Sequence, residues 1–159
     1  MNGVSLSAIY IEGTAHFTHV TVKEDIESTD TVLENLGETT IVNSIFVDLA
    51  DAGTVCNGEN VTVTASLISD GSCGIVDGVD GNLSGYAGVS SFVTDAGGLT
   101  PTLRLRSDSP AIDVARRDAC PQIDQRWYER PQGVGCDMGA FEYDAEPYSQ
   151  HLMPIVFAR

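Results

Sequence analysis

The feature that most constrains the fold of this chain is a short repeat in its first 69 residues. The segment Phe17–Val22 can be laid over Ile41–Phe46 at a spacing of 24 residues, and that segment over Val63–Ile68 at a spacing of 22. Repeats of about 20–50 residues are typical of solenoids. A separate set of apolar residues obeys the same two spacings: Ile9, Leu33 and Val55. The sequence therefore predicts a solenoid.

The repeated segments have the composition of β-strands. They are short and rich in β-branched residues, and turns such as Glu12-Gly13 and Asn57-Gly58 separate them. They lack the 3.6-residue periodicity of helices, so we expect a coiled ladder of parallel strands. Asn43 stands at a position that holds His19 one repeat earlier and Ala65 one repeat later. An Asn in an interior turn can hydrogen-bond the backbone of the next coil, and we expect this ladder to be incomplete.

Charge is the unusual part of the composition. The chain has 159 residues, enough for one domain with a sizeable core, and its net charge is −15. Residues 1–103 hold 14 acidic residues against Lys23 alone, a balance of −13, whereas residues 104–159 balance to −2. A field of this sign repels nucleic acid and anionic lipid surfaces and can attract divalent cations.

Three acids in turns form a weak calcium candidate, although their spacing matches no known calcium loop: Asp70, Asp77 and Asp80. Otherwise we expect no cofactor.

The four cysteines form two local pairs, Cys56 with Cys73 and Cys120 with Cys136. No Cys-x-x-Cys occurs and no His lies at zinc-finger spacing, which disfavours a structural zinc site. Two disulfides are the better interpretation, with free buried thiols as the alternative, and disulfides imply an oxidising compartment. The first ten residues show no signal-peptide pattern, and no apolar run approaches the ~20 residues of a membrane span. We therefore expect an extracellular or cell-surface chain that is the end of a longer exported protein or starts in the middle of a domain.

The C-terminal third carries four blocks in a fixed order: Ser109-Pro-Ala-Ile-Asp113, Cys120-Pro-Gln-Ile-Asp-Gln-Arg126, Arg130-Pro-Gln-Gly-Val-Gly-Cys136 and Asp137-Met-Gly-Ala-Phe-Glu142. This series resembles the end of secreted bacterial right-handed parallel β-helix proteins, the choice-of-anchor Q domain proteins. The resemblance implies an all-β fold, a right-handed parallel β-helix of about three coils with an irregular, disulfide-pinned C-terminal cap. We expect one domain over residues 1–143, with repeat coils in 1–69 and a turn-rich coil and cap in 70–143. A loosely held tail would follow over residues 144–159.

The charged residues of these blocks have two interpretations. The resemblance implies that they belong to the terminal cap, where carboxylate–guanidinium pairs and carboxylates that accept backbone N–H groups hold irregular loops. The set is Asp113, Asp124, Arg126, Arg130, Asp137 and Glu142. The alternative is a carbohydrate-active enzyme, a polysaccharide lyase or glycoside hydrolase, in which two acids flank one scissile bond. Its catalytic candidates would be Asp113, Asp124 and Asp137.

An aromatic insertion marks where this chain departs from the family. Relatives usually run Asp-Gln-Arg-Gly and on to Arg-Pro, but here Trp127-Tyr128-Glu129 separates Arg126 from Arg130. The two aromatic residues between two arginines could form a platform on which a sugar ring stacks. Alternatively, the pair covers the open end of the hydrophobic coil. The missing glycine argues against the tight turn that it would make.

We expect a non-catalytic function: structural closure of a secreted or cell-surface β-helix protein, with weak glycan adhesion as an added role. The chain has one Lys and three His, at positions His16, His19 and His151, which are few basic residues for a lyase that must neutralise a uronate. It also lacks a Gly-x-Ser-x-Gly nucleophile elbow. We expect His16 and His19 to be one exposed and one packed histidine. Because the first ten residues offer no amphipathic helix to cover the first coil, we also expect a homo-oligomer through this N-terminal edge.

Overall fold

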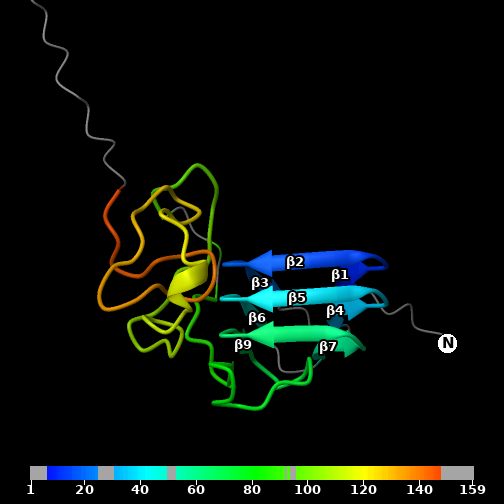
Figure 1. Cartoon of the computed structure of the whole chain (residues 1–159). Coiled ribbons are helices and arrows are strands. Elements are labelled where there is room, and N and C mark those ends of the chain that lie inside the picture. Colours follow the sequence, from blue (N-terminus) through cyan, green and yellow to red (C-terminus); the bar gives the residue numbers. More distant parts are fainter. Residues whose placement is uncertain (1–6, 25–30, 50–52, 92, 94–95, 148–159) are drawn as a thin grey trace, which may run out of the picture.

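The computed structural model describes residues 7–24, 31–49, 53–91, 93 and 96–147, and this part of the chain is almost entirely β-structure and turns (Figure 1). A single 3₁₀-helix lies in the described residues, at Arg117–Ala119. The strands are β1 (Ser7–Ile11), β2 (Thr14–Thr18), β3 (Thr21–Glu24), β4 (Thr31–Asn35), β5 (Glu38–Val42), β6 (Ile45–Asp48), β7 (Thr54–Gly58), β8 (Val61–Thr64), β9 (Leu67–Ile68) and β10 (Leu83–Ser84).

The strands form three parallel sheets that the chain visits in rotation. The sheet orders are β1-β4-β7, β2-β5-β8 and β3-β6-β9-β10. Three consecutive strands therefore contribute one strand to each sheet, and we call such a set a rung: rung 1 is β1–β3, rung 2 is β4–β6 and rung 3 is β7–β9. Figure 1 shows the rungs stacked on one another, with β2, β5 and the strand below them at the front.

The register confirms two of the three apolar tracks read from the sequence. Phe17 pairs with Ile41 and Ile41 with Val63, and the track that begins at Val22 runs through Phe46 to Ile68 in the same way. The parallel pairing follows from this exact repetition of apolar positions.

The third track is wrong in its last member. Leu33 pairs with Ile9 but then with Cys56, not with Val55. The reason is a shorter corner in rung 3. In rung 2, three residues lie between Asn35 and Thr39. In rung 3, Gly58 and Val61 occupy the equivalent positions, and only two residues lie between them. The spacing between paired residues of rungs 2 and 3 is thus 23 before this corner and 22 after it.

One corner of each rung is built on a residue in the left-handed conformation. His19, Asn43 and Ala65 follow the second strands of their rungs with φ values of 51°, 50° and 46°. The sequence suggested that the Asn43 side chain would bind the backbone of the next rung, but it binds the backbone of Arg116 instead. Its Oδ1 accepts the backbone N–H of Arg116 at 2.8 Å, and its Nδ2 donates to the Arg116 carbonyl at 3.0 Å.

The polar ladder between rungs lies one residue later than expected. Ser44 Oγ accepts the backbone N–H of Val20 at 3.1 Å, and Ser66 Oγ accepts that of Ser44 at 3.0 Å. Asn82 continues the series, since its Oδ1 accepts the backbone N–H of Ser66 at 3.2 Å. These buried side chains satisfy corner N–H groups that the strand ladders do not reach.

The corner between the first and second strands of rungs 2 and 3 requires glycine. A Cβ built on Gly37 would lie 1.9 Å from the carbonyl oxygen of Gly13, and one built on Gly58 would lie 1.9 Å from that of Asn35. Successive rungs therefore approach so closely here that no side chain fits. Gly13, on rung 1, has nothing within 4 Å of such a Cβ.

Two hydrophobic clusters form the core. One lies inside the rungs and includes Leu33, Ile41, Phe46 and Ile68. The other joins the outer face of β6 and β9 to residues of the C-terminal part, and it contains Ile45 and Leu67 together with residues from Ala87 to Phe141. The sheet β3-β6-β9-β10 is therefore covered on both faces. We call the described residues from 85 to 147 the flanking cap.

The position of the flanking cap corrects the expectation of an end cap. Figure 1 shows its loops beside the ends of β2 and β5, along the flank of all three rungs. The end of the internal cluster is instead closed by residues 70–84, where β10 adds to β9 and where Cys73 and Ile75 pack on the cluster. Of the expected tail, residues 148–159 lie outside the described residues, and Pro147 forms an antiparallel bridge with Tyr128.

Both expected disulfides are confirmed. Cys56 on β7 is bonded to Cys73, and Cys120 to Cys136 within the flanking cap. The first therefore ties rung 3 to the segment that closes it, and the second ties two irregular loops together.

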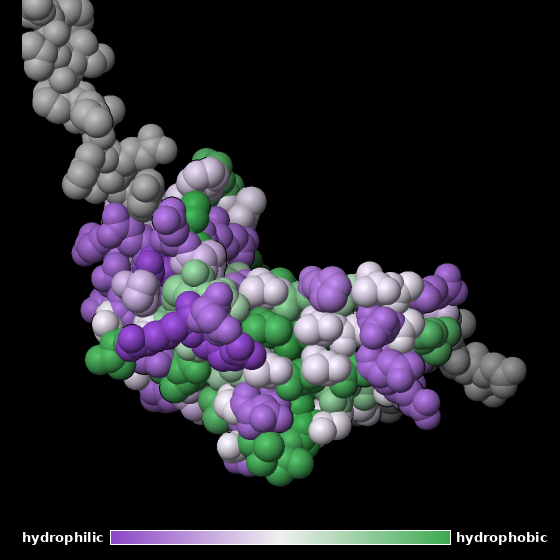
Figure 2. All heavy atoms as spheres, in the orientation of Figure 1, coloured by the Kyte–Doolittle hydropathy of each residue, from purple (hydrophilic) through white to green (hydrophobic). Residues whose placement is uncertain are grey.

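The exposed face of the sheet β2-β5-β8 is nearly free of charge. Figure 2 shows it as mostly pale, whereas strongly hydrophilic residues gather on the flanking cap. Its outward side chains are largely threonines: Thr14, Thr18, Thr40, Thr62 and Thr64. The strongly hydrophilic residues are thus unevenly spread over the visible surface.

Candidate functional site

The first centre of the flanking cap is the ion pair between Asp124 and Arg126. Arg126 Nη2 lies 2.6 Å from Asp124 Oδ2, and the two side chains are 6% and 0% exposed. The same carboxylate accepts backbone N–H groups from Arg126, Tyr128 and Glu142 at 2.7–3.1 Å. The guanidinium carbon lies over two rings, 4.1 Å from the centroid of Tyr128 and 3.6 Å from that of Phe141. Asp124 and Arg126 therefore hold together loops that have no regular hydrogen bonding.

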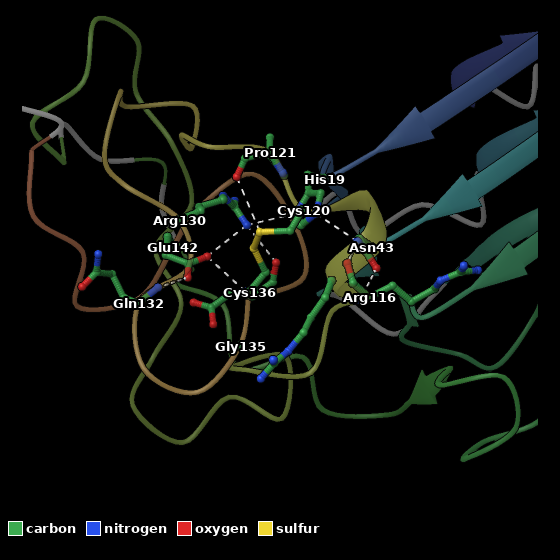
Figure 3. The surroundings of a disulfide bond; sticks show 12 residues. His19, Asn43, Arg116, Cys120, Pro121, Arg130, Gln132, Gly135, Cys136 and Glu142 are labelled. Atoms are coloured by element: carbon green, nitrogen blue, oxygen red, sulfur yellow. Dashed lines mark hydrogen bonds and ion pairs between the residues drawn. A yellow bond between two sulfur atoms is a disulfide. The ribbon is translucent and has the colours of Figure 1, made fainter. Parts of the chain in front are cut away.

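The second centre is Arg130, which binds both the cap and rung 1 (Figure 3). Its Nη1 lies 3.0 Å from Glu142 Oε2, with both side chains fully buried. It also donates to the carbonyls of Asp137 and Gly139, each at 2.8 Å, and lies 3.0 Å from Nδ1 of His19. The other ring nitrogen of His19, Nε2, lies 3.0 Å from Nδ2 of Asn43, so the ring lies between the guanidinium and the amide of the next rung. Arg130 Nε is buried and has no hydrogen-bond partner among the described residues.

The remaining acids also serve as acceptors for loop backbone. Asp113 Oδ1 accepts the N–H groups of Val134 and Gly135 at 2.9 Å each. Asp137 accepts those of Asp113, at 2.8 Å, and Tyr143. Glu142 Oε1 accepts that of Gln132 at 2.7 Å and Oε2 that of Asp137 at 3.0 Å.

Burial is the largest cause of the pKa shifts of Glu142, Asp137 and His19. It raises the pKa of Glu142 to about 7, against the opposing influence of the two N–H groups and of Arg130. It also raises the pKa of Asp137. Burial lowers the pKa of His19 to about 4, and the positive charge of Arg130 acts in the same direction. His19 is therefore neutral at neutral pH.

Sequence reasoning missed the residues that attach the cap to the rungs. His19 is 8% exposed and His16 is exposed, so one histidine is packed and one exposed, as expected. Yet His19 contacts Arg130, 111 residues away, as well as Asn43 on the next rung. The Asn43 side chain binds the backbone of Arg116, and Ala140 N donates to Thr21 Oγ1 at 2.9 Å. The only signal for these contacts was the ladder position shared by His19 and Asn43.

The aromatic segment forms the tight turn that we did not expect without a glycine. Trp127 takes the left-handed conformation itself, with φ 67°, and its N–H donates to Asp124 O at 3.0 Å. Its side chain is 56% exposed, while Tyr128 is half-buried. Arg126 and Arg130 are each 7% exposed. Of the four residues of the expected platform, only the two aromatic ones therefore present surface.

A cleft of about 420 Å³ lies where rung 1 meets the flanking cap. Residues 18–21 form one wall, and Pro121, Ile123, Gln125 and Ala140 contribute to the other. Asp124 and Arg130 also border it, but both are occupied by the contacts described above. The cleft thus offers a mixed apolar and amide surface rather than a pair of available acids.

The three calcium candidates are not brought together as a site. Asp70 accepts the backbone N–H of Val55 and both donors of Ser72, and Asp77 accepts that of Ser84 at 2.8 Å. Asp80 is an exposed turn residue with φ 53°. In the part of the chain that the structure describes, no three His, Cys, Asp or Glu side chains are grouped to hold a metal ion.

Comparison with known proteins adds no relative. No family model, curated protein or solved structure matches this chain. Among the described residues, no helix has the length and apolar character that a membrane span requires.

Proposed function

We propose that this chain is a non-catalytic end segment of a secreted or cell-surface protein of the right-handed parallel β-helix type, and that it serves as structural closure. Three rungs of parallel strands and a flanking cap that contacts them support this role. The two disulfides fit an oxidising, extracellular location. The resemblance of the C-terminal blocks to choice-of-anchor Q proteins supports the same proposal.

The observation that carries the proposal is the way the candidate acids are used. Hydrolysis of a glycoside needs two carboxylates on either side of one bond, with room for the substrate between them. Asp113, Asp124 and Asp137 each accept backbone N–H groups instead, and Asp124 also pairs with Arg126. Removing such an acceptor leaves buried donors without partners, which costs about 1–3 kcal/mol per group. These acids therefore fit a stabilising role.

Asp124→Asn tests this role. We expect the variant to unfold at clearly lower urea concentration than the wild type, and neither protein to degrade pectin, alginate, chondroitin or simple esters above background. Asp118→Asn is the control, because Asp118 pairs with Arg116 at the surface and its loss should leave stability nearly unchanged. Robust turnover that Asp124→Asn abolishes without unfolding the protein would overturn the non-catalytic role.

Weak glycan adhesion through Trp127 is the second part of the proposal. A bulky residue in the left-handed conformation is strained, and such strain gathers at functional positions. Here it presents a large aromatic surface to solvent. The face of an indole packs well against the C–H face of a pyranose ring.

A glycan array measures this adhesion. We expect low-affinity binding that Trp127→Ala removes and that Tyr10→Ala retains, since Tyr10 is a similarly exposed aromatic, 55% exposed, on β1. Binding that survives Trp127→Ala would rule out the Trp127 platform, and the structural role would still be tested by Asp124→Asn.

A further inference from the structure

Another cavity of the flanking cap, about 350 Å³ in volume, lies beside the disulfide between Cys120 and Cys136. Both cysteines line it, together with Arg117, Arg130 and several uncharged residues. Cys120 is half-buried, whereas Cys136 is 1% exposed. In thiol–disulfide exchange a thiolate attacks one sulfur and the other sulfur leaves. The more accessible Cys120 is therefore the sulfur open to attack from this cavity, and Cys136 is the leaving group.

The two guanidinium groups that line this cavity are bound in different ways. Arg130 is buried and pairs with Glu142 at 3.0 Å, and Figure 3 shows this pair beside the two cysteines. Arg117 is exposed, and its Nη2 donates at 2.6 Å to the carbonyl of Val134, which is a neutral group. Arg117 has no carboxylate partner among the described residues. Its positive charge is thus available to attract an anion to the cavity.

The other disulfide, between Cys56 and Cys73, has different surroundings. Cys56 belongs to the apolar cluster inside the rungs, and Cys73 packs against that cluster. The carboxylate of Asp70 accepts the N–H of Val55, next to Cys56, and both donors of Ser72, next to Cys73. A negative charge beside this bond repels an approaching thiolate and opposes the formation of a leaving one. The two disulfides therefore differ in charge as well as in access.

The loops that the Cys120–Cys136 bond joins are also held by other contacts. Ala115 donates its N–H to the Cys136 carbonyl at 2.9 Å. The side chain of Asn43 binds both backbone groups of Arg116, shortly before Cys120 in the chain. Opening of the disulfide leaves these contacts in place, so the flanking cap can stay folded while the bond exchanges.

We propose that this cavity is a thiol-exchange site for a small thiol that carries a carboxylate. The thiolate attacks Cys120 Sγ, the Cys120–Cys136 bond breaks, and the electron pair leaves on Cys136 Sγ, which takes up a proton from water. A second thiolate then attacks the sulfur of the first thiol in the mixed disulfide, and Cys120 leaves as a thiolate. Two small thiols are thereby oxidised to their disulfide while the protein disulfide is reduced to two thiols. Arg117 attracts the carboxylate of the small thiol.

Three small thiols that differ in charge test the site: mercaptopropionate, mercaptoethanol and cysteamine, which are anionic, neutral and cationic. The folded protein is treated with each at equal thiolate concentration, alkylated and mapped by mass spectrometry. Each rate is divided by the rate of the same thiolate with a small uncharged disulfide, which removes differences in intrinsic nucleophilicity. We expect the adduct on Cys120 and the alkyl group on Cys136, with Cys56–Cys73 reacting at least about tenfold more slowly. Mercaptopropionate should have the highest corrected rate and cysteamine the lowest.

Arg117→Met tests the origin of this preference, because the described contact that it removes is one surface hydrogen bond. We expect the advantage of mercaptopropionate over mercaptoethanol to fall about threefold, as for the loss of an exposed ion pair, and Arg117→Lys to retain it. Arg116→Met is the matched control, because Arg116 pairs with Asp118 and does not line the cavity. An advantage that survives Arg117→Met, or that is absent from the wild type, overturns the proposal.

The location of the reaction is a separate readout in the same samples. An adduct that forms first on Cys56 or Cys73, or equal rates for the two disulfides, overturns the proposal. So does exchange that occurs only in urea that unfolds the protein, or exchange that abolishes the circular dichroism of the folded chain. The inference goes beyond the proposed function, and the glycan and turnover assays do not depend on it.

Discussion

The rungs and the flanking cap of this protein are stabilised by different interactions. In the rungs, strand ladders join backbone to backbone, and apolar side chains stack in register. In the cap, backbone N–H groups are bound by buried carboxylates, and guanidinium groups bind carbonyls. A repeated sequence can satisfy its backbone from the neighbouring rung. An irregular one needs charged side chains to do the same work. The cap therefore places more of its stability on single residues.

The largest expected effect comes from Arg130→Met. It leaves Glu142 buried without its partner and frees the carbonyls of Asp137 and Gly139, and breaking one side of a buried pair costs about 3–5 kcal/mol. Urea unfolding followed by circular dichroism measures the loss. Ile41→Val in a rung should cost only about 0.5–1.5 kcal/mol. Equal losses for the two variants would remove the difference between rungs and cap.

The glycine corner gives the next largest effect, now within the rungs. Gly37→Ala places a Cβ against the carbonyl of Gly13, and relief of such overpacking costs about 1–3 kcal/mol. Gly13→Ala meets no atom and should change stability by less than about 0.5 kcal/mol. Thermal unfolding of both variants tests whether close rung packing matters. A Gly37→Ala variant as stable as the wild type would contradict it.

The pH dependence of stability separates His19 from Glu142. The pKa of Glu142 is raised to about 7, so its contribution is present at low pH and is lost as the pH rises toward 7. The pKa of His19 is lowered to about 4, so stability falls as the pH drops below the ordinary histidine pKa toward 4. Between roughly pH 4.5 and 6.5, the two slopes oppose each other and the wild type should change little.

His19→Asn removes one of these slopes. Asn tolerates the left-handed conformation and already occupies the equivalent position 43. We expect the variant to lose roughly 1–2 kcal/mol as the pH rises through this interval, as measured by urea midpoints at several pH values. His16→Asn, at an exposed site, should follow the wild type. Identical profiles for all three proteins would show that His19 does not titrate in this way.

The smallest expected effect is a gain. Trp127→Gly relieves a left-handed conformation that costs an ordinary residue about 1–2 kcal/mol, less the greater flexibility of glycine in the unfolded chain. We expect a net stabilisation of about 0.5–1 kcal/mol in urea unfolding, and Trp127→Val should lose stability instead. A destabilised Trp127→Gly would mean that the indole packs on the cap in a way that outweighs the strain.

The sequence predicted the rungs far better than the cap. The tracks through Phe17 and Val22 fixed the register because each repeat returns to the same apolar position. The shift from Val55 to Cys56 escaped prediction because a one-residue deletion at a corner leaves the apolar pattern of β7 ambiguous: both residues are buried. The contact between His19 and Arg130 joins residues far apart in the chain, and no periodicity relates them. The disulfides were predictable because each pair is local.

The short corner between β7 and β8 shows how the rungs handle changes of length. Rung 3 has one residue fewer there, yet β8 pairs with β5 in full register. The corner therefore accommodates the deletion, so that the next strand begins in register. Such a chain can gain or lose residues at its corners over evolution, or by design, while its three sheets stay aligned. Insertions inside the strands would not be absorbed in this way.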